Sequence, residues 1–283
     1  MLWIYNLPNW AMCLMIVSVF VGGSMLGLKL VRPWVKTHCY EAFQDHNEAV
    51  SAFIGTFGVF YGITLGLIAV ATWENFEEAS SIVDQEAASL SALYRDVSAF
   101  PEPSRSILRR RLSDYLHFII NVAWNAHRHG IIPPVGLKLA TEFEKELVKF
   151  EPTNRREEAL FHETLDQFDQ MLMLKQSRLD AVSSGLPDIL WWVVLVGAVL
   201  NILLVYLIHI EPARTHFFLI GLLAAFIGLM VFLVAALDHP FRGQFKIGPE
   251  PFEQVQDTWY RLDEAGVDDE PTPRGNPSPD ENK

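Results

Sequence analysis

The stretch that decides the fold is Ala49 to Trp73, AVSAFIGTFGVFYGITLGLIAVATW, which carries no charged side chain. About 20 apolar residues suffice for a helix to cross a bilayer, so this run is long enough to span one. Phe53, Phe57 and Phe60 recur at helical intervals, which places the three rings on one face. The neighbouring faces have little side-chain bulk, because glycines occupy positions 55, 58, 62 and 66. This combination is typical either of close helix packing or of the wall of a narrow pore.

Three further blocks lack Asp, Glu, Lys and Arg over a comparable length, namely Trp10 to Leu28, Ile189 to Ile210 and Thr215 to Leu237. Half of the 283 residues are hydrophobic although 20% are charged, so apolar and polar residues are segregated along the chain. Each block is long enough for a bilayer span. The sequence therefore predicts an all-α membrane protein with four transmembrane helices and a helical extramembrane domain inserted between helices 2 and 3.

The polar residues between the second and third spans show helical periodicity, interrupted by proline and glycine. They predict helices over residues 75–99, 105–127, 136–150 and 154–183. The predicted organisation is 1–73 for the first two spans, 74–188 for the helical domain, 189–237 for the last two spans, 238–263 for a post-membrane turn and segment, and 264–283 for a disordered acidic tail. The tail lacks aromatic residues and is rich in Pro, Asp, Glu and Asn, so it cannot bury enough apolar surface to order itself.

The net charge of −12 argues against nucleic-acid binding and against docking on anionic lipid through basic patches. Four spans place both termini and the helical domain on one side of the membrane. Basic residues flank the spans on both sides, with Lys175, Arg178, Arg242 and Lys246 on that side and Lys29, Arg32, Lys36 and Arg214 on the other. The positive-inside rule therefore gives no preferred orientation.

Motifs for catalysis are absent from the sequence: it has no phosphate-binding loop, dinucleotide fingerprint, nucleophile elbow or zinc-protease pair. The nearest imitation of a metal site is His127-Arg128-His129 with His117 upstream, but neither cysteine nor carboxylate lies at ligand spacing. We interpret these residues as solvated histidines at a helix end. Asn201, a strongly polar residue inside a span, is more often a helix-to-helix contact than a site. We expect no enzyme activity, no metal and no cofactor.

The phenylalanine face is the first candidate site. In the commoner interpretation, these rings pack against lipid or other helices. In the other, they form a hydrophobic constriction that gates ions by dewetting. The glycines favour the second alternative, because they let identical helices approach around an axis. Under that hypothesis the pore is lined by Phe53, Thr56, Phe57, Phe60 and Thr64, and its exit carries Glu74, Glu77 and Glu78.

The second candidate is the post-span turn, which directly follows the last apolar block and reads Asp238-His239-Pro240-Phe241-Arg242-Gly243. In one interpretation it is an ordinary helix end, with proline stopping the helix. In the other, Asp238, Pro240, Phe241 and Gly243 form a tight turn that locks the last span against the polar domain and supplies oxygen ligands.

These two features together resemble bestrophin channels. Phe60-Tyr61-Gly62-Ile63-Thr64-Leu65, followed by Trp73-Glu74-Asn75-Phe76, is similar to the second helix of those channels, where a Phe-Tyr and Thr-Leu pair in the pore neck precedes a tryptophan-rich exit. The post-span turn looks like their Asn-Pro-Phe-Gly turn. Residues 1 to about 262 resemble the bacterial bestrophin-like family more closely, through His46-Asn47-Glu48, Glu86-Ala87 and Trp124.

The resemblance implies a homo-oligomeric channel, a pentamer, in the bacterial inner membrane, with the second spans lining the pore for an inorganic ion. It also implies that the helical domain and both termini are cytoplasmic. The acidic calcium-binding run of bestrophins is replaced here by Arg242, Gln244 and Lys246, so calcium gating is not predicted. Selectivity stays open, since the acidic exit favours cations. The alternative is a non-conducting membrane scaffold or sensor whose helical domain binds a partner.

Overall fold

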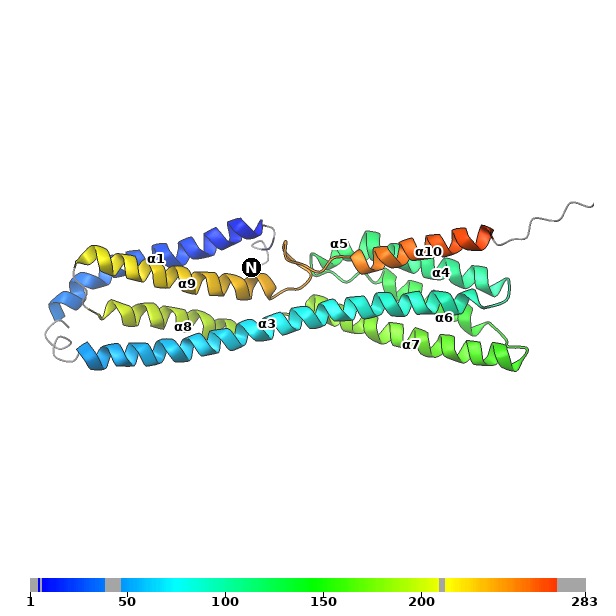
Figure 1. Cartoon of the computed structure of the whole chain (residues 1–283), viewed down its shortest axis with the longest axis horizontal. Coiled ribbons are helices and arrows are strands. Elements are labelled where there is room, and N and C mark those ends of the chain that lie inside the picture. The colour runs from blue at the N-terminus through cyan, green and yellow to red at the C-terminus, as the bar shows by residue number, and fades with distance from the viewer. Residues whose placement is uncertain (1–4, 6, 39–46, 209–211, 269–283) are drawn as a thin grey trace, which may run out of the picture. The chain divides into compact units, whose positions relative to one another are not determined.

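The computed structural model describes residues 5, 7–38, 47–208 and 212–268, and within these ranges the regular elements are all helical (Figure 1). In chain order they are α1 (Asn9–His38), α3 (Asn47–Ser98), α4 (Ser104–Phe118), the π-helical turn η2 (Ile119–Ala123), α5 (Trp124–His127), α6 (Val135–Val148), α7 (Arg155–Ser183), α8 (Asp188–Tyr206), α9 (Ala213–Leu237) and α10 (Glu250–Asp268). The predicted all-α class is confirmed.

Four of these helical stretches are long and apolar enough to cross a membrane: Asn9–Val35, part of Ser51–Ser98, part of Arg155–Tyr206, and Ala213–Leu237. Each overlaps one of the four apolar blocks of the sequence, so the prediction of four spans is confirmed. In α3 the apolar part is followed without a break by a polar part, because no proline or glycine interrupts the helix between Trp73 and Ser98.

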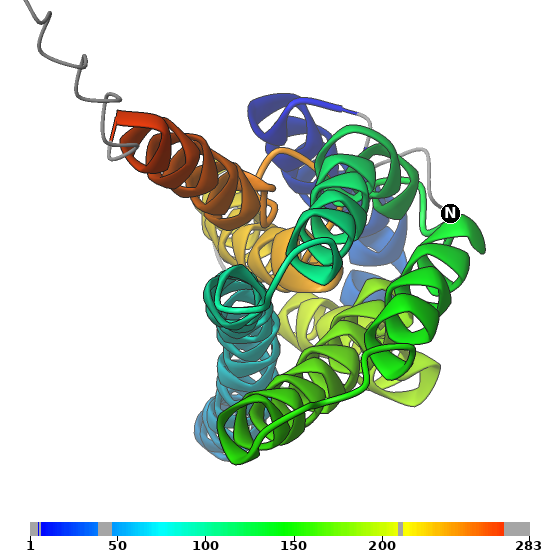
Figure 2. The ribbon, with the colours of Figure 1, turned by 90° about the vertical axis from the view of Figure 1, so that its right-hand side faces the viewer.

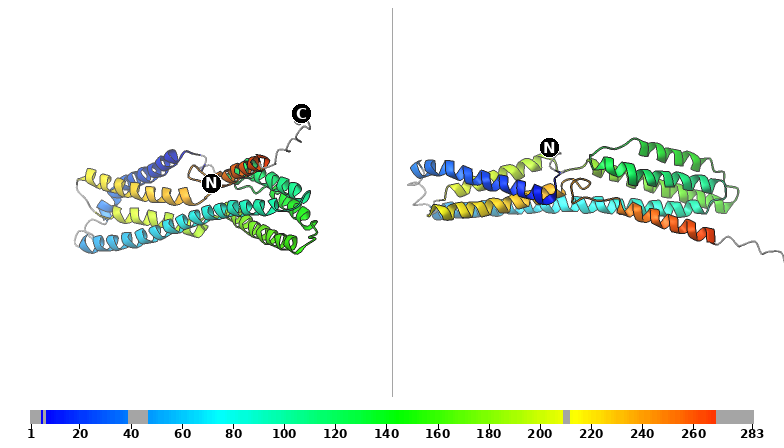
Figure 3. Two further views of the ribbon diagram at one scale, coloured as in Figure 1. Left: turned by 45° about the vertical axis from the view of Figure 1, so that its right-hand side comes forward. Right: turned by 90° about the horizontal axis from the view of Figure 1, so that it is seen from above.

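The chain divides into two compact units. The first comprises residues up to Ile82, residues 127–131 and residues 177–247. In it, α1 lies beside α9, as two further views show (Figure 3). Its apolar core joins three helices, with Leu65, Ile68 and Ala69 from α3, Val194 and Ala198 from α8, and Ile227, Val231 and Val234 from α9.

Small residues let these helices approach closely. The hydroxyl of Tyr206 donates to the carbonyl oxygen of Ser24 at 2.7 Å. A Cβ added at Gly27 would lie only 2.5 Å from the hydroxyl oxygen of Tyr206, so this close approach requires glycine. A Cβ at Gly228 of α9 would lie 3.1 Å from the backbone of Val17 in α1. Packing of this kind holds helices together in lipid, where the hydrophobic effect between helices is weak.

The second unit comprises residues 83–126, 132–176 and 248 onward, and Figure 2 views its helices end-on. Helices α6 and α7 agree with the ranges predicted from periodicity to within two residues, whereas the predicted helix 105–127 is divided into α4, the π-helical turn η2 and α5. The sequence predicts no helix after residue 238 and a disordered tail from residue 264, whereas α10 occupies Glu250–Asp268 and so includes the first five residues of that tail. It buries Phe252, Val255 and Trp259 along one face. Residues 269–283 of the predicted tail lie outside the described residues.

Candidate pore helix and post-span turn

The phenylalanine face of α3 is divided between two environments. The side chains of Phe53 and Phe60 are 60% and 67% exposed, and Thr56 is exposed with them. Phe57 and Thr64 are half-buried. The five predicted pore residues therefore share one helix, but two of them lie at the edge of the exposed face.

The opposite face of α3 packs inside the protomer. Leu65, Ile68 and Ala69 belong to the apolar core, and the hydroxyl of Tyr61 donates to the carbonyl oxygen of Val194 at 3.0 Å. Because these contacts fix the rotation of the helix about its axis, Phe53 and Phe60 are directed away from the other spans of the same protomer.

The glycines of α3 are used unequally. A Cβ at Gly55, Gly62 or Gly66 would meet no atom within 4 Å, so these glycines serve no contact inside the described protomer. A Cβ at Gly58 would lie 3.8 Å from the Oδ1 atom of Asn201. The amide of Asn201 donates to the carbonyl oxygen of Gly197 at 3.1 Å, one turn earlier in α8 itself, so this hydrogen bond does not join two helices.

The two threonines of the candidate pore face donate their hydroxyl protons to the preceding helical turn. Thr56 Oγ1 donates to the carbonyl oxygen of Ala52 and Thr64 Oγ1 to that of Phe60, both at 2.9 Å. Because the hydroxyl proton is already donated, the lone pairs of each hydroxyl oxygen remain available to accept a hydrogen bond from water or to contact a cation.

The acidic residues after the apolar run are all exposed, with Glu74, Glu77 and Glu78 on α3. Glu74 and Glu78 are four residues apart, a spacing at which like charges on a helix repel. The neighbouring rings are ordered, because Trp73 stacks on Phe76 with centroids 6.2 Å apart and Phe76 on Phe245 at 5.0 Å. The three exposed carboxylates therefore lie on a part of α3 whose aromatic side chains are packed against one another.

The post-span turn forms as a closed backbone structure. The N–H of Arg242 donates to the carbonyl oxygen of His239 at 3.0 Å, and that of Ile247 to the carbonyl oxygen of Pro240 at 2.9 Å. Gly243 has φ +78°, a conformation that a residue with a Cβ rarely adopts. The ring of Phe241 is buried, with its centroid 6.3 Å from that of His127.

Asp238 links the end of α9 to the start of α8. One carboxylate oxygen accepts the backbone N–H of Leu186, and the other lies 3.4 Å from Trp191 Nε1 and 3.4 Å from the Tyr5 hydroxyl. Burial raises the pKa of Tyr5, and the nearby charge of Asp238 raises it further. Asp238 thus connects the end of α9 to the start of α8 and to Tyr5, which precedes α1, and all of these belong to one unit.

The interpretation of His127 as a solvated histidine is wrong. Its side chain is buried, and Arg178 Nη1 lies 3.2 Å from its Nδ1 atom. Burial, followed by the charge of Arg178, lowers its pKa from 6.5 to about 3, so the ring is neutral at ordinary pH. His129, two residues later, is exposed as expected. Sequence alone missed the burial because the covering residues come from α7 and the post-span turn.

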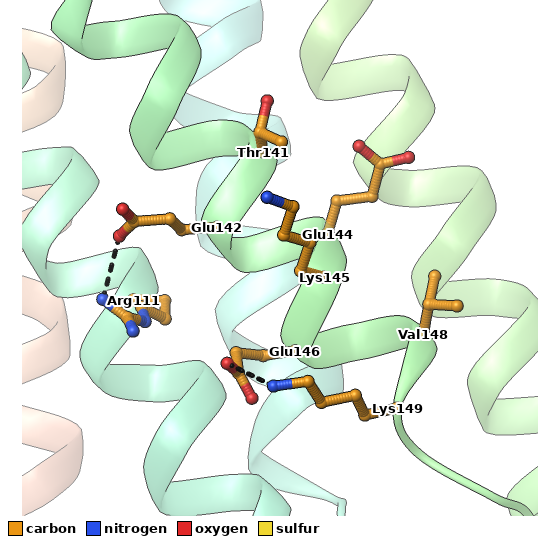
Figure 4. Close-up of a pocket in the computed structure, with 8 residues that line it drawn as sticks. All are labelled: Arg111, Thr141, Glu142, Glu144, Lys145, Glu146, Val148 and Lys149. Atoms are coloured by element: carbon orange, nitrogen blue, oxygen red, sulfur yellow. Dashed lines mark hydrogen bonds and ion pairs between the residues drawn. The ribbon is translucent and has the colours of Figure 1, made fainter.

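A surface pocket of about 490 Å³ lies along α6 in the second unit (Figure 4). Four of its charged side chains form two ion pairs: Arg111 Nη1 lies 3.0 Å from Glu142 Oε2 and Lys149 Nζ lies 2.9 Å from Glu146 Oε1. These are ordinary solvated ion pairs and carry no arrangement for catalysis. In the part of the chain that the structure describes, no group of three or more His, Cys, Asp and Glu side chains is placed to hold a metal ion.

Comparison with known proteins gives one consistent result. The family described as Bestrophin-like domain matches residues 18–252. A crystal structure of a mutant bacterial bestrophin homolog from Klebsiella pneumoniae is 13% identical, with a TM-score of 0.58, and the match covers 89% of this chain and 98% of that one. A second mutant of the Klebsiella homolog is 14% identical, with a TM-score of 0.59 and coverages of 87% and 99%. A structure described as a membrane protein is 11% identical, with a TM-score of 0.62 and coverages of 87% and 98%. No curated protein matches the chain.

Proposed function

Because this chain belongs to the family of bestrophin-like domains, we propose that it is an ion channel whose pore is lined by α3 in a homo-oligomer. The likeness to the bacterial bestrophin homologs extends over most of both chains and supports the same fold. It is a multi-pass membrane protein, because four of its helices are long and apolar enough to cross a membrane. The proposed setting is the bacterial inner membrane, with the helical domain and both termini in the cytoplasm.

The observation that carries the proposal is the unpartnered face of α3. Phe53 and Phe60 are exposed beside Gly55 and Gly62, which have open space around them. One protomer cannot enclose a path along one helix face, so the proposal requires several copies around an axis, five by the family resemblance. Glycines without packing partners would then admit the adjacent copy's helix.

The chemistry of the face suits conduction through a hydrophobic neck. Rings of Phe53, Phe57 and Phe60 from each copy would form a constriction that conducts when wetted and blocks when dry. The oxygens of Thr56 and Thr64 would offer the permeant ion or its water a polar step between the rings. Glu74, Glu77 and Glu78 would concentrate cations at the exit, which favours cation conduction.

The post-span turn has a supporting part in this proposal. Asp238 links the end of α9 to the start of α8, Pro240, Phe241 and Gly243 belong to the turn that follows it, and both helices pack on the buried face of α3. The turn would therefore keep the rotation of α3 fixed while the copies assemble. No ligand role is needed for Asp238 in conduction.

One observation favours the alternative of a non-conducting scaffold. Phe218 and Phe226 of α9 are 68% and 61% exposed, so exposed phenylalanine is not confined to α3. Such side chains can simply face lipid. The alternative and the channel differ in whether the rings of α3 control an ion path.

Ion flux into proteoliposomes, with the oligomer size measured on the same sample, tests the proposal. We expect an oligomer that conducts, and a Phe53→Ala, Phe60→Ala double variant with altered flux because the constriction is widened. The matched control is Phe218→Ala with Phe226→Ala, which removes two equally exposed rings from α9 and should leave flux unchanged. A monomer, an absence of flux, or equal effects of the two double variants would contradict the proposal.

A further inference from the structure

A pocket of about 560 Å³ lies between Tyr5, the start of α8 and the end of α9, within the first unit. Two carboxylates line it, Asp188 and Asp238, together with the aromatic side chains of Tyr5, Trp191 and Trp192. Neither lysine nor arginine occurs among the described residues of the lining. The pocket is therefore acidic and aromatic, and the basic side chain among its described lining residues is His239, whose Nε2 atom lies 3.7 Å from Asp238 Oδ2.

Asp238 is buried, with only 8% of the residue exposed, yet the hydrogen-bonding capacity of its carboxylate is only partly used. Its Oδ1 atom accepts the N–H of Leu186. Its Oδ2 atom lies 3.4 Å from Trp191 Nε1, 3.4 Å from the Tyr5 hydroxyl and 3.7 Å from His239 Nε2. All three distances exceed the usual ranges, which are about 2.7–3.2 Å for an N–H···O bond and about 2.5–3.0 Å for an O–H···O bond. A buried ionised carboxylate is costly without strong partners, so Oδ2 has capacity for a further cationic donor.

The rings around Oδ2 select the kind of cation. Tyr5 and Trp191 each direct a polar edge to Asp238, and the rings of Tyr5, Trp191 and Trp192 all line the pocket that this carboxylate lines. Aromatic faces attract organic ammonium groups, and cages of such rings recognise them. Calcium and magnesium instead require about six or more oxygen ligands, which two carboxylates among apolar walls do not supply.

The remaining lining identifies the source of the ammonium. Ile16, Leu195 and Val231 continue the pocket along the apolar part of the spans, and Leu195 and Trp192 are exposed on the outside of α8. Paired tryptophans at the start of an apolar helix mark the level of lipid headgroups. The pocket thus has a charged aromatic end at headgroup level and an apolar end at the level of acyl chains.

We propose that this pocket binds the primary ammonium headgroup of an aminophospholipid of the phosphatidylethanolamine class. The ammonium lies between Asp238 Oδ2 and Asp188 and against the rings of Trp191 and Trp192, while an acyl chain follows Leu195. The phosphate stays outside, since the described lining has neither lysine nor arginine for it and its imidazole, that of His239, lies beside Asp238. This site is separate from the α3 face and does not depend on ion conduction.

Native mass spectrometry of the delipidated full chain, titrated with single lipids, tests the proposal. We expect phosphatidylethanolamine to bind roughly tenfold or more tightly than its N-acetylated form, which keeps the phosphate and acyl chains but has no ammonium. Phosphatidylglycerol should bind as weakly as the N-acetylated lipid. Free ethanolamine at equal concentration should not displace the lipid, because it lacks the acyl contacts.

Two exposed positions give variants that leave the fold intact. Asp188→Asn and Trp192→Leu should each weaken phosphatidylethanolamine binding by roughly tenfold, since each removes one attraction for the ammonium. Trp10→Leu is the matched control, because Trp10 is a similarly exposed tryptophan near the start of a span and does not line the pocket. Asp238→Asn should weaken binding further.

Three results would overturn the proposal. Equal affinity for phosphatidylethanolamine and phosphatidylglycerol would mean that the pocket accepts lipid without regard to charge. Displacement by free ethanolamine at equal concentration would assign the site to a soluble amine. Wild-type binding by both Asp188→Asn and Trp192→Leu would place the bound lipid elsewhere on the protein.

Discussion

The ring of Tyr61 on α3 packs against Gly197 on α8 so closely that a Cβ at Gly197 would lie 2.5 Å from ring carbon Cε2. The same contact brings the Tyr61 hydroxyl to the carbonyl oxygen of Val194. Because Tyr61 is held inward, the adjacent Phe60 and Gly62 are turned outward. This aromatic–glycine contact therefore helps the core residues Leu65, Ile68 and Ala69 to set the exposed face of α3, on which the channel proposal depends.

Gly197→Ala should destabilise the membrane unit, because the new methyl group overlaps the Tyr61 ring and overpacking costs about 1–3 kcal/mol. The measurement is thermal denaturation of the purified protein in detergent. Gly23→Ala is the control, since a Cβ at Gly23 of α1 meets nothing within 4 Å. Equal melting temperatures for the two variants would show that Tyr61 and Gly197 are not in contact.

Replacement of Asp238 should separate its hydrogen-bonding role from its charge. Asp238→Asn keeps an acceptor for the N–H of Leu186, whereas Asp238→Ala leaves that buried donor unpaired, at a cost of about 1–3 kcal/mol. We expect thermal stability to fall in the order wild type, Asn variant, Ala variant. An Ala variant as stable as the Asn variant would contradict the link between α8 and α9.

His127 should make stability depend on pH on the acid side. Its pKa of about 3 in the folded protein lies below the 6.5 of an unfolded histidine, so the unfolded chain binds the proton more tightly. The stability from burying the neutral ring is complete above pH 6.5 and is lost as the pH falls toward 3. Within that window the loss is at most about 1.4 kcal/mol per pH unit.

Melting temperatures between pH 7 and pH 4 (roughly the upper part of that window) test this linkage in wild type, His127→Asn and His129→Asn. The wild type and the His129→Asn variant should lose stability steeply with acid, because His129 is exposed and His127 is unchanged. His127→Asn should show a shallower slope. Parallel slopes for all three proteins would mean that His127 is not buried in the neutral form.

The docking of α10 should depend on its rings more than on its ion pair. Trp259 stacks on Tyr94 with centroids 4.1 Å apart, and Tyr94 donates to Asp263 at 2.8 Å. The partner of Asp263, Arg109 Nη2 at 2.8 Å, is partly solvated, and such pairs contribute about 0–1 kcal/mol. Trp259→Ala should cost about 3–5 kcal/mol.

Limited proteolysis reads out this difference directly. We expect Trp259→Ala to expose α10 to cleavage and Asp263→Asn to leave it nearly as protected as in the wild type. Burial and the bond to Asp263 raise the pKa of Tyr94 to about 12, in keeping with an enclosed hydroxyl. Faster cleavage of the Asp263→Asn variant than of the Trp259→Ala variant would reverse the assignment.

The spans and most helices follow from local information in the sequence. Runs of apolar residues identify α1, α3, α8 and α9 without knowledge of their contacts, since length and composition alone decide whether a helix can cross a bilayer. Proline and glycine mark the ends of the polar helices. Phe252, Val255 and Trp259 also have helical spacing, so α10 was detectable, although its other residues are mainly polar.

The environment of a side chain depends on partners that are distant in the sequence. Tyr5 and Asp238 are 233 positions apart, and nothing in either segment indicates the other. His127 is buried by Arg178 and Phe241, so its helix-end position alone suggested solvent. The spacing of the phenylalanines predicted a common face but not that Phe57 would be half-buried.

Cysteine accessibility during current recording tests the central claim that the exposed face of α3 borders an ion path. In a background with Cys13 and Cys39 replaced, Thr56→Cys would place a thiol on that face, and Leu222→Cys would place one on the exposed surface of α9. A charged, water-soluble thiol reagent should change the current through the Thr56→Cys protein and leave the Leu222→Cys protein unaffected. Unchanged current through both, or an equal change in both, would contradict a pore along α3.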